Sequence, residues 1–462
     1  MIRLVAIPLG LATSRGSLLA LLLIAPVLAF AALWAVTRYS HRLMIAAVVI
    51  LTLIPIVGFP SHELLQPGVV GLIVIAYAGF VGLLPRRRLH LTMVDAGAFV
   101  VFAGCVLSVV HGNQTKPDLE HVFFLWLCPY FAARSITGSG GRKTVLKAFA
   151  VAGAVAIPFG IVEITYGNLF LKTFPFGSDP EYGLGVPSLR LGSVRAEGAF
   201  GQPIPYAMFL SIAVVAAITL WMSRENRRSN RWLYLGLGIV AIQATALSRT
   251  GWLMLAVVAG VVIVFNFETI FSYKNRRLIL LALVALAVVL ALPTTNALIL
   301  GSSGTESTNL EESANYRSRL IHEALQPGYI NPYGTTEPQV GPLGRNSIDD
   351  EYIHAAWTWG YLPLAGFAVL FLAFLRGAWR QRRDPVTLAI YATSIATMVA
   401  LESVAFLTQQ EVLIWLLWGC ASGLTVRPVR RTFQPVERAL QVMTQRGQLA
   451  ARSKGSPRAV VS

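Results

Sequence analysis

Residues 203–222 read PIPYAMFLSIAVVAAITLWM, an apolar run of the length that an α-helix needs to cross a lipid bilayer. Pro203 suits the first turn of such a helix. Comparable runs recur along the chain, whose 462 residues are 55% apolar and only 13% charged. A soluble protein of this length carries roughly twice that charged fraction, and a transmembrane barrel needs short alternating segments. The pattern therefore predicts an all-α, polytopic membrane helix bundle.

We expect about twelve to fourteen spans. They cover residues 17–36, 43–59, 68–84, 94–110, 118–134, 144–166, 203–222, 232–247, 251–267, 278–296, 353–375, 386–405 and 409–425. Loops rich in arginine alternate with loops that are not, and the positive-inside rule places the basic loops in the cytoplasm. The loops at 60–67, 111–117, 167–202 and 297–352 then face outside. The helical domain is predicted to cover 1–429, and 430–462 to form a basic cytoplasmic tail, disordered or lying on the membrane surface.

The net charge of +16 suggests nucleic acid at first sight, but the positive charge sits in short blocks between spans. That distribution is typical of cytoplasmic loops facing anionic lipid, so no nucleic-acid partner is expected. The cysteines lie inside apolar runs without metal-type spacing, which predicts small core residues: Cys105, Cys128 and Cys420. Three carboxylates lie in or near the ends of predicted spans: Asp95, Glu163 and Glu402. For each of them we expect a pair with a neighbouring helix, or a position at the membrane interface, rather than a role in a proton relay.

Two arginines border turns that the topology places on the outer face. Arg195 opens the stretch RAEGAFGQP (195–203), whose glycines allow close approach of the backbone. Arg249 lies in the tight turn ALSRTGW (246–252), where a charge faces either headgroups or a protein cavity. The alternatives are that Arg195 pairs with Glu197 or lipid headgroups, and that Arg249 reaches lipid phosphate. Both arginines are candidates for binding an anionic ligand.

The long polar insertion at 301–352 carries the other candidates. Arg317 and Arg319 belong to a short amphipathic stretch, and their spacing of two keeps them off a common helix face. A solvated helix face is the alternative for this pair. Asp349 and Asp350 close the insertion, and His354 follows one turn later on the same helix face; these three are the candidate general bases. Carboxylates at the start of a helix also suit a capping role.

Taken in this order, the motifs resemble the O-antigen ligase and Wzy-type polysaccharide polymerase superfamily. That family has R-x-x-G-x-F-x-x-P before a span, S-R between two spans, an arginine and a P-x-x-G-type patch in a large outer loop, and [HD]-N-x-Y-L before a glycine-bearing span. The positions supplied here are Arg195, Gly198, Phe200 and Pro203; Ser248 and Arg249; Arg317 with Leu320 and Ala324; and Asp349, Asp350, Tyr352 and Gly360. The resemblance covers 195–366. Asp349 stands where the ligases carry histidine, and Asp350 replaces the asparagine, which resembles polymerase-type members.

The resemblance implies glycosyl transfer on the outer face of the bacterial cytoplasmic membrane. The donor would be a glycan on a polyprenyl diphosphate such as undecaprenyl diphosphate, and the acceptor a hydroxyl of a glycan, a lipid-linked repeat or a protein. The diphosphate leaving group would be stabilised by Arg195, by Arg249 and by either Arg317 or Arg319. One of the candidate bases would take the proton of the acceptor hydroxyl. No cofactor and no metal are implied, although adjacent aspartates could hold Mg²⁺ beside a diphosphate.

Other functions remain open at this level. A transporter or flippase of a lipid-linked or anionic envelope precursor is the main alternative, and such proteins often contain internal repeats, which we do not find. A non-catalytic scaffold subunit would need no outer arginine set. Within glycosyl transfer, the choice between ligase and polymerase stays open, with the aspartate favouring a polymerase.

Overall fold

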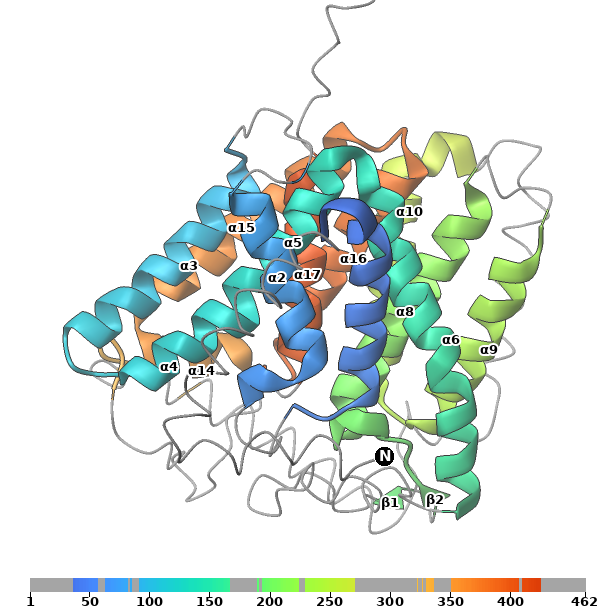
Figure 1. The fold of residues 1–462 in the computed structure, drawn as a ribbon, viewed down its shortest axis with the longest axis horizontal. Helices are drawn as coiled ribbons and strands as arrows, with labels where there is room; N and C mark the ends of the chain where they lie inside the picture. The colour runs from blue at the N-terminus through green and yellow to red at the C-terminus, as the bar shows by residue number, and fades with distance from the viewer. Residues whose placement is uncertain are drawn as a thin grey trace, which may run out of the picture.

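The chain folds into a bundle of helices (Figure 1). The computed structural model describes residues 36–56, 63–81, 84, 91–166, 189–190, 193–223, 229–270, 322, 326, 330–335, 350–406 and 409–424. Within these residues the only strands are β1 (Leu189–Arg190) and β2 (Ser193–Val194), which form one short antiparallel pair. The described part of the chain is thus a helical bundle, as predicted.

Five described helical stretches are long and apolar enough to cross a membrane: Val36–Leu53, α3 (Met93–Val110), Lys116–Thr165, α8 (Pro203–Met222) and α15 (Tyr361–Arg380). The other main helices are α2 (Pro67–Phe80), α9 (Arg231–Thr245), α10 (Arg249–Ile270), α14 (Glu351–Trp359), α16 (Pro385–Ala400) and α17 (Gln409–Gly423). The protein is therefore a helical membrane protein. The total number of spans stays a prediction, because the expected spans at 17–36 and 278–296 lie largely or wholly outside the described residues.

Most predicted spans agree with the helices, and α8 has the predicted bounds. The loop expected before residue 43 is wrong, since the helix already begins by Val36 and carries Arg38 and Arg42 in its first turns. Arginine favours helix, and the Arg42 guanidinium lies 5.8 Å from the Tyr39 ring centroid.

The break expected between the spans at 118–134 and 144–166 is present, but it is a kink between two helices and not a loop. Helix continues through α4 (Lys116–His121), a π-helical turn (Val122–Leu127), α5 (Cys128–Ile136), a second π-helical turn (Thr137–Gly141) and α6 (Arg142–Tyr166). Gly140 produces a kink there instead of a loop, because its φ of 99° is left-handed.

The span expected at 353–375 is divided into two helices. Gly360 has φ 90° and ψ −171°, which ends α14 and begins α15 in a new direction. A Cβ at this position would stand 2.1 Å from the carbonyl oxygen of Pro332, so only glycine fits. Because α14 has nine residues, it is too short to cross a membrane by itself.

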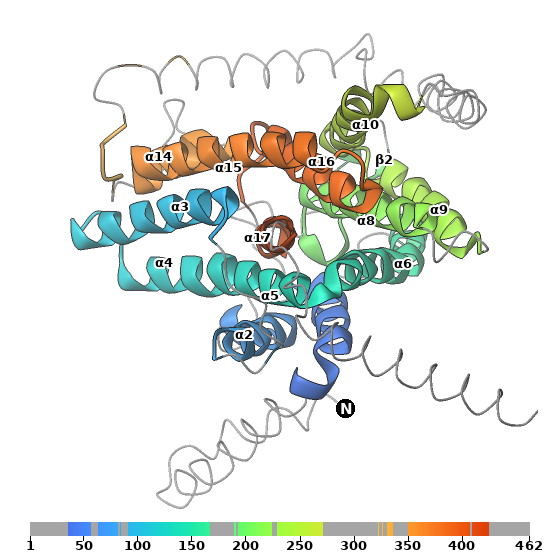
Figure 2. The same cartoon turned by 90° about the horizontal axis from the view of Figure 1, so that it is seen from above.

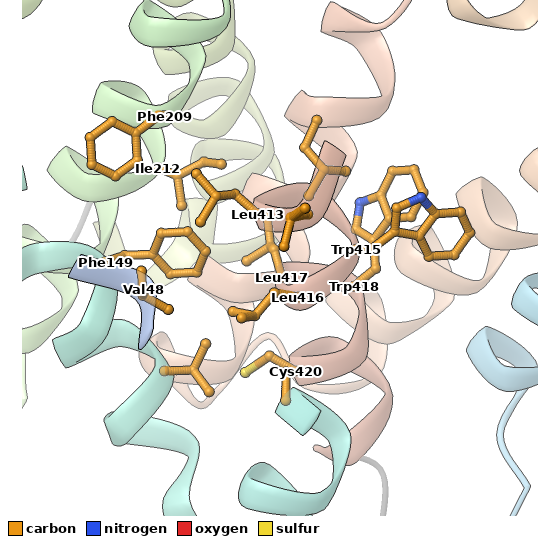
Figure 3. Packing of buried hydrophobic residues seen from close by; sticks show 14 of the residues in the cluster. Val48, Phe149, Phe209, Ile212, Leu413, Trp415, Leu416, Leu417, Trp418 and Cys420 are labelled. Carbon is orange, nitrogen blue, oxygen red and sulfur yellow. The ribbon is translucent and has the colours of Figure 1, made fainter. Parts of the chain in front are cut away.

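Helix α17 forms the centre of the bundle, with the other helices around it (Figure 2). Every residue from Gln409 to Gly423 is buried. Its apolar side chains pack against α8, α6 and the helix Val36–Leu53 through Phe209, Phe149 and Val48 (Figure 3). On another side Trp415 and Trp418 meet at 4.9 Å between ring centroids. A helix that is apolar and buried all round is typical of the core of a membrane bundle.

The bundle has two ends with different chemistry. At the Arg142 end, Arg142 at the start of α6 pairs with Asp384 just before α16, and His41 contacts Thr144. This end also carries the basic residues that border α9 and α15: Arg231, Arg376, Arg380, Arg382 and Arg383. At the Asp350 end, Glu351 N donates to Leu401 O (2.9 Å) and Gln409 Nε2 to Ala199 O (2.8 Å). The described basic loops predicted to share one side thus do gather at one end.

Candidate functional site

The loop that carries Arg195 lies against the end of α9. Arg195 Nε donates a hydrogen bond to the carbonyl of Ala246 (3.0 Å), and Ala196 N donates to the carbonyl of Thr245 (3.2 Å). These two bonds tie the first predicted motif to the turn that contains the second. Arg195 as a whole is partly buried.

The same loop is held from the other side by Glu163 of α6, which is 2% exposed. Its Oε2 accepts a hydrogen bond from Gly198 N at 2.9 Å. Gly198 has φ 56°, and a Cβ there would stand 2.9 Å from the Tyr206 ring, so glycine allows the loop to approach α8 closely. The predicted pairing of Glu163 thus takes the form of a bond to backbone. Sequence reasoning missed this role, since a backbone N–H leaves no signal in residue type.

Arg249 begins α10 directly after a strained turn. Leu247 has φ 46°, a left-handed conformation that costs a non-glycine residue about 1–2 kcal/mol. Ser248 is buried, and Arg249 is partly buried. Strain of this kind persists where the surrounding structure holds it, and it is common at binding sites.

Asp350 caps α14 and is buried. Its Oδ1 accepts hydrogen bonds from Tyr352 N (2.8 Å) and Ile353 N (3.1 Å), so the predicted capping role is confirmed. Burial raises the pKa of Asp350 to about 6; the two backbone bonds act against this rise, and the nearby charges of Glu402 and Glu351 add to it. A carboxyl with that pKa exchanges protons near neutral pH, which suits a general base.

The next carboxylate, Glu351, has a structural role. Its Oε2 accepts from Phe406 N at 2.6 Å while its backbone N donates to Leu401 O. His354 Nδ1 lies 3.6 Å from the same Oε2, beyond a hydrogen bond. The His354 backbone N donates to Asp350 O, which places this candidate one turn along α14, as predicted.

The segment Leu401–Phe406 joins the motifs of the Asp350 end. Glu351 bonds to its two ends, Leu401 O and Phe406 N. Its Ser403 Oγ lies 3.3 Å from Oγ1 of Thr250, which follows Arg249 in the chain. The Arg195 loop therefore contacts the turn before Arg249 directly. The segment Leu401–Phe406 links that turn to the start of α14, where Asp350 lies. Sequence analysis did not single out Ser403 or the Glu351–Phe406 bond.

Part of the long polar insertion is fixed to this end as well. Residues 330–335 pack on the junction of α14 and α15, where Thr335 N donates to Trp357 O (3.1 Å). The Tyr333 ring stacks on His111 at 3.8 Å between centroids, and Gln114 Nε2 donates to Thr335 O (2.8 Å). The loops at 111–117 and 297–352, predicted to share a face, do meet. Three predicted site residues lie outside the described residues: Arg317, Arg319 and Asp349.

Buried polar atoms without a hydrogen-bond partner in the described structure are frequent at the Asp350 end. They belong to Glu163 (Oε1), Gln243 (Nε2 and Oε1), Ser248 (Oγ), Glu351 (Oε1), His354 (Nδ1), Gln409 (Oε1) and Gln410 (Oε1). Native proteins leave few such atoms, and each one calls for an explanation, such as a ligand or ordered water. These atoms make the Asp350 end the candidate place for a polar ligand or ordered water.

The Arg142 end shows the opposite situation at Asp95. Arg134 donates to Asp95 from Nε (2.7 Å) and from Nη2 (2.8 Å), and Tyr130 and Ser422 donate at 2.6 and 2.7 Å. Thr92 N completes the set in a capping box at the start of α3. The predicted pairing with a neighbouring helix is confirmed for Asp95, and the pair is saturated. Among the described residues no three metal-ligating side chains form a group, and the three cysteines are buried thiols.

No protein-family model matches the sequence, and neither does any curated protein.

Proposed function

We propose that this chain is a membrane glycosyltransferase that moves or polymerises a polyprenyl-diphosphate-linked glycan at the outer face of the bacterial cytoplasmic membrane, in cell-surface polysaccharide synthesis. The observation that carries this proposal is the meeting of the Arg195 loop, the Arg249 turn and the Asp350 cap at one end of the bundle. Two cations and a carboxyl with raised pKa beside a membrane suit transfer from a lipid diphosphate.

Each residue then has a chemical role. As the glycosidic bond to the donor breaks, negative charge grows on the diphosphate, and Arg195 and Arg249 stabilise it with charge-assisted hydrogen bonds. Asp350, ionised above pH about 6, accepts the proton of the attacking hydroxyl. Arg317, Arg319 and Asp349 belong to the same proposal through the resemblance. His354 is the second candidate base near Asp350.

The proposed orientation rests on the distribution of charge. The Arg142 end carries Arg142 and the arginines that border α9 and α15, and the positive-inside rule assigns an end rich in arginine to the cytoplasm. The Asp350 end then faces outside, where the glycan on its lipid carrier would be met.

The test is a deletion strain complemented with single variants. We expect Arg195→Ala and Arg249→Ala to abolish the surface glycan while the protein remains in the membrane at normal levels. Arg380→Ala, an exposed arginine at the opposite end, is the matched control and should complement fully. Normal glycan from both outer variants would refute the diphosphate-binding role.

Extraction of lipid-linked intermediates from the same strain separates the activities. Accumulated single lipid-linked repeats on the outer face identify a polymerase, whereas finished polymer left on its carrier identifies a ligase. Intermediates confined to the cytoplasmic face would identify a transporter and overturn the proposal.

A further inference from the structure

Gln243, near the end of α9, is a buried side chain with no hydrogen bond. It is 0% exposed, and neither its Nε2 nor its Oε1 has a partner within the described structure. Ser248, five residues later in the turn before α10, is 1% exposed, and its Oγ also has no partner there. An unsatisfied buried amide is costly, so a fold that retains one has a reason to do so.

These two residues flank Ala246, the residue to which Arg195 is bonded. Ala246 N donates to Gln243 O (3.2 Å), and the carbonyl of the same Ala246 accepts the hydrogen bond of Arg195 Nε. The amide also packs against Gly251, where a Cβ would stand 2.9 Å from Gln243 Nε2. Gln243 and Ser248 therefore border the turn that carries Arg249 and receives Arg195, and their polar side-chain atoms are buried there.

The unpartnered atoms define the chemistry of what they can bind. A glutamine amide offers a donor and an acceptor, and a serine hydroxyl offers both as well. Neither amide atom of Gln243 has a partner, so exchanging the assigned positions of its oxygen and nitrogen still leaves one free donor and one free acceptor. A phosphate oxygen at neutral pH only accepts hydrogen bonds and would leave Gln243 Oε1 unmatched. A hydroxyl group both donates and accepts, and it fits.

We propose that Gln243 and Ser248 form a subsite for a hydroxyl group of the sugar next to the diphosphate held by Arg195 and Arg249. The subsite rests on the proposed function and specifies how the glycan is recognised. Gln243 has no exposed surface in the ligand-free chain, so the sugar reaches it when the turn shifts. Leu247, held at φ 46° in that turn, gives the turn a strained conformation that it can leave on binding.

The chain offers a matched control in Gln66, another glutamine that is 0% exposed. Its Nε2 donates to Ile54 O (3.1 Å) and Ile50 O (3.3 Å), and its Oε1 accepts from Val69 N (2.9 Å). Gln243→Met and Gln66→Met remove the same amide from similar surroundings and keep the side-chain length. Only the second removes existing hydrogen bonds.

The first measurement is thermal unfolding of the two purified, ligand-free variants. Gln66→Met should lower the melting temperature, whereas Gln243→Met should leave it unchanged or raise it, because an apolar group replaces unsatisfied atoms. If Gln243→Met is destabilised as much as Gln66→Met, the amide has a structural role and the subsite does not exist.

The second measurement is the thermal shift caused by two probes: undecaprenyl diphosphate, and the lipid-linked saccharide purified from the deletion strain. Gln243→Met should keep the shift with the sugar-free lipid and bind the saccharide-bearing lipid about tenfold more weakly, with KM for transfer rising by the same factor. Equal binding of the saccharide by wild type and Gln243→Met would overturn the subsite alone. No shift of the wild type with either lipid would overturn the proposed function together with the subsite.

Discussion

Replacing Asp350 by asparagine tests the proposed base without removing the helix cap. The asparagine side chain can still accept the bonds from Tyr352 N and Ile353 N, because asparagine caps helices as well as aspartate does. The substitution therefore removes a proton-accepting carboxylate and its charge, and it leaves the start of α14 in place.

The magnitude follows from the pKa of Asp350, about 6 in the fold against a usual 3.8. A difference of about two in pKa, at 1.36 kcal/mol for each pKa unit, corresponds to about 3 kcal/mol. Because the pKa is raised, the ionised carboxylate destabilises the fold. The penalty is complete above pH about 6 and disappears as pH falls towards 3.8. The asparagine variant lacks this penalty at every pH.

We expect Asp350→Asn to unfold several degrees above the wild type at pH 7.5, and the gap to close on acidification. Glycan transfer by the same variant should fall roughly 10²- to 10⁴-fold, the usual contribution of a general base. For the wild type, kcat/KM should decline below pH about 6 as the carboxylate is protonated.

Asp384→Asn provides the control, since Asp384 caps α16 at the opposite end by accepting from Val386 N (3.2 Å). It should keep full transfer activity. Near-normal transfer by Asp350→Asn would remove Asp350 from the mechanism and leave Asp349 or His354 as the base. A stability gap that does not change between pH 7.5 and pH 4.5 would contradict the assigned burial of its charge.

Three further substitutions test the frame around the site. Asp95→Asn should lower stability by about 3–5 kcal/mol, because it leaves the buried Arg134 guanidinium without its carboxylate; denaturant unfolding in detergent measures this, and a loss below about 1 kcal/mol would contradict it. Gly360→Ala should prevent stable folding or force the Pro332 turn away, since its Cβ would meet the Pro332 carbonyl oxygen at 2.1 Å; an unchanged melting temperature would refute this close contact. Glu163→Ala should reduce transfer by releasing Gly198 N, whereas Glu163→Gln, which keeps an acceptor, should restore most of it; equal loss in both would show that the charge matters, not the bond.

The sequence was sufficient for elements whose signal is local. The apolar run at 203–222 matches α8 because Pro203 sets its start and its length fits a bilayer. The distribution of arginine separated the two ends, and the carboxylates before α14 predicted a cap that Asp350 forms. Each of these depends on residues close together in the chain.

The errors arose where distant contacts decide the structure. Gly360 divides a continuous apolar run because it packs on Pro332, a residue of the polar insertion. The break between the spans at 118–134 and 144–166 was predicted, but its form was not: it is a kink at Gly140 instead of a loop, and Gly141 lies against His41. Glu163 and Glu351 bind backbone N–H groups 35 and 55 residues away, and a backbone donor has no residue identity to detect.

The contrast between the two ends of the bundle bears on where a ligand belongs. At the Arg142 end, the buried carboxylate of Asp95 has hydrogen bonds from arginine, tyrosine, serine and backbone, so it stabilises the bundle without further partners. At the Asp350 end, Gln243 and Ser248 are as deeply buried, yet they have no partners in the described structure. Each such group costs about 1–3 kcal/mol, and an apolar residue of similar shape would avoid the cost. Ordered water or a polar ligand can supply the missing hydrogen bonds, and the comparison of Gln243→Met with Gln66→Met tests the ligand.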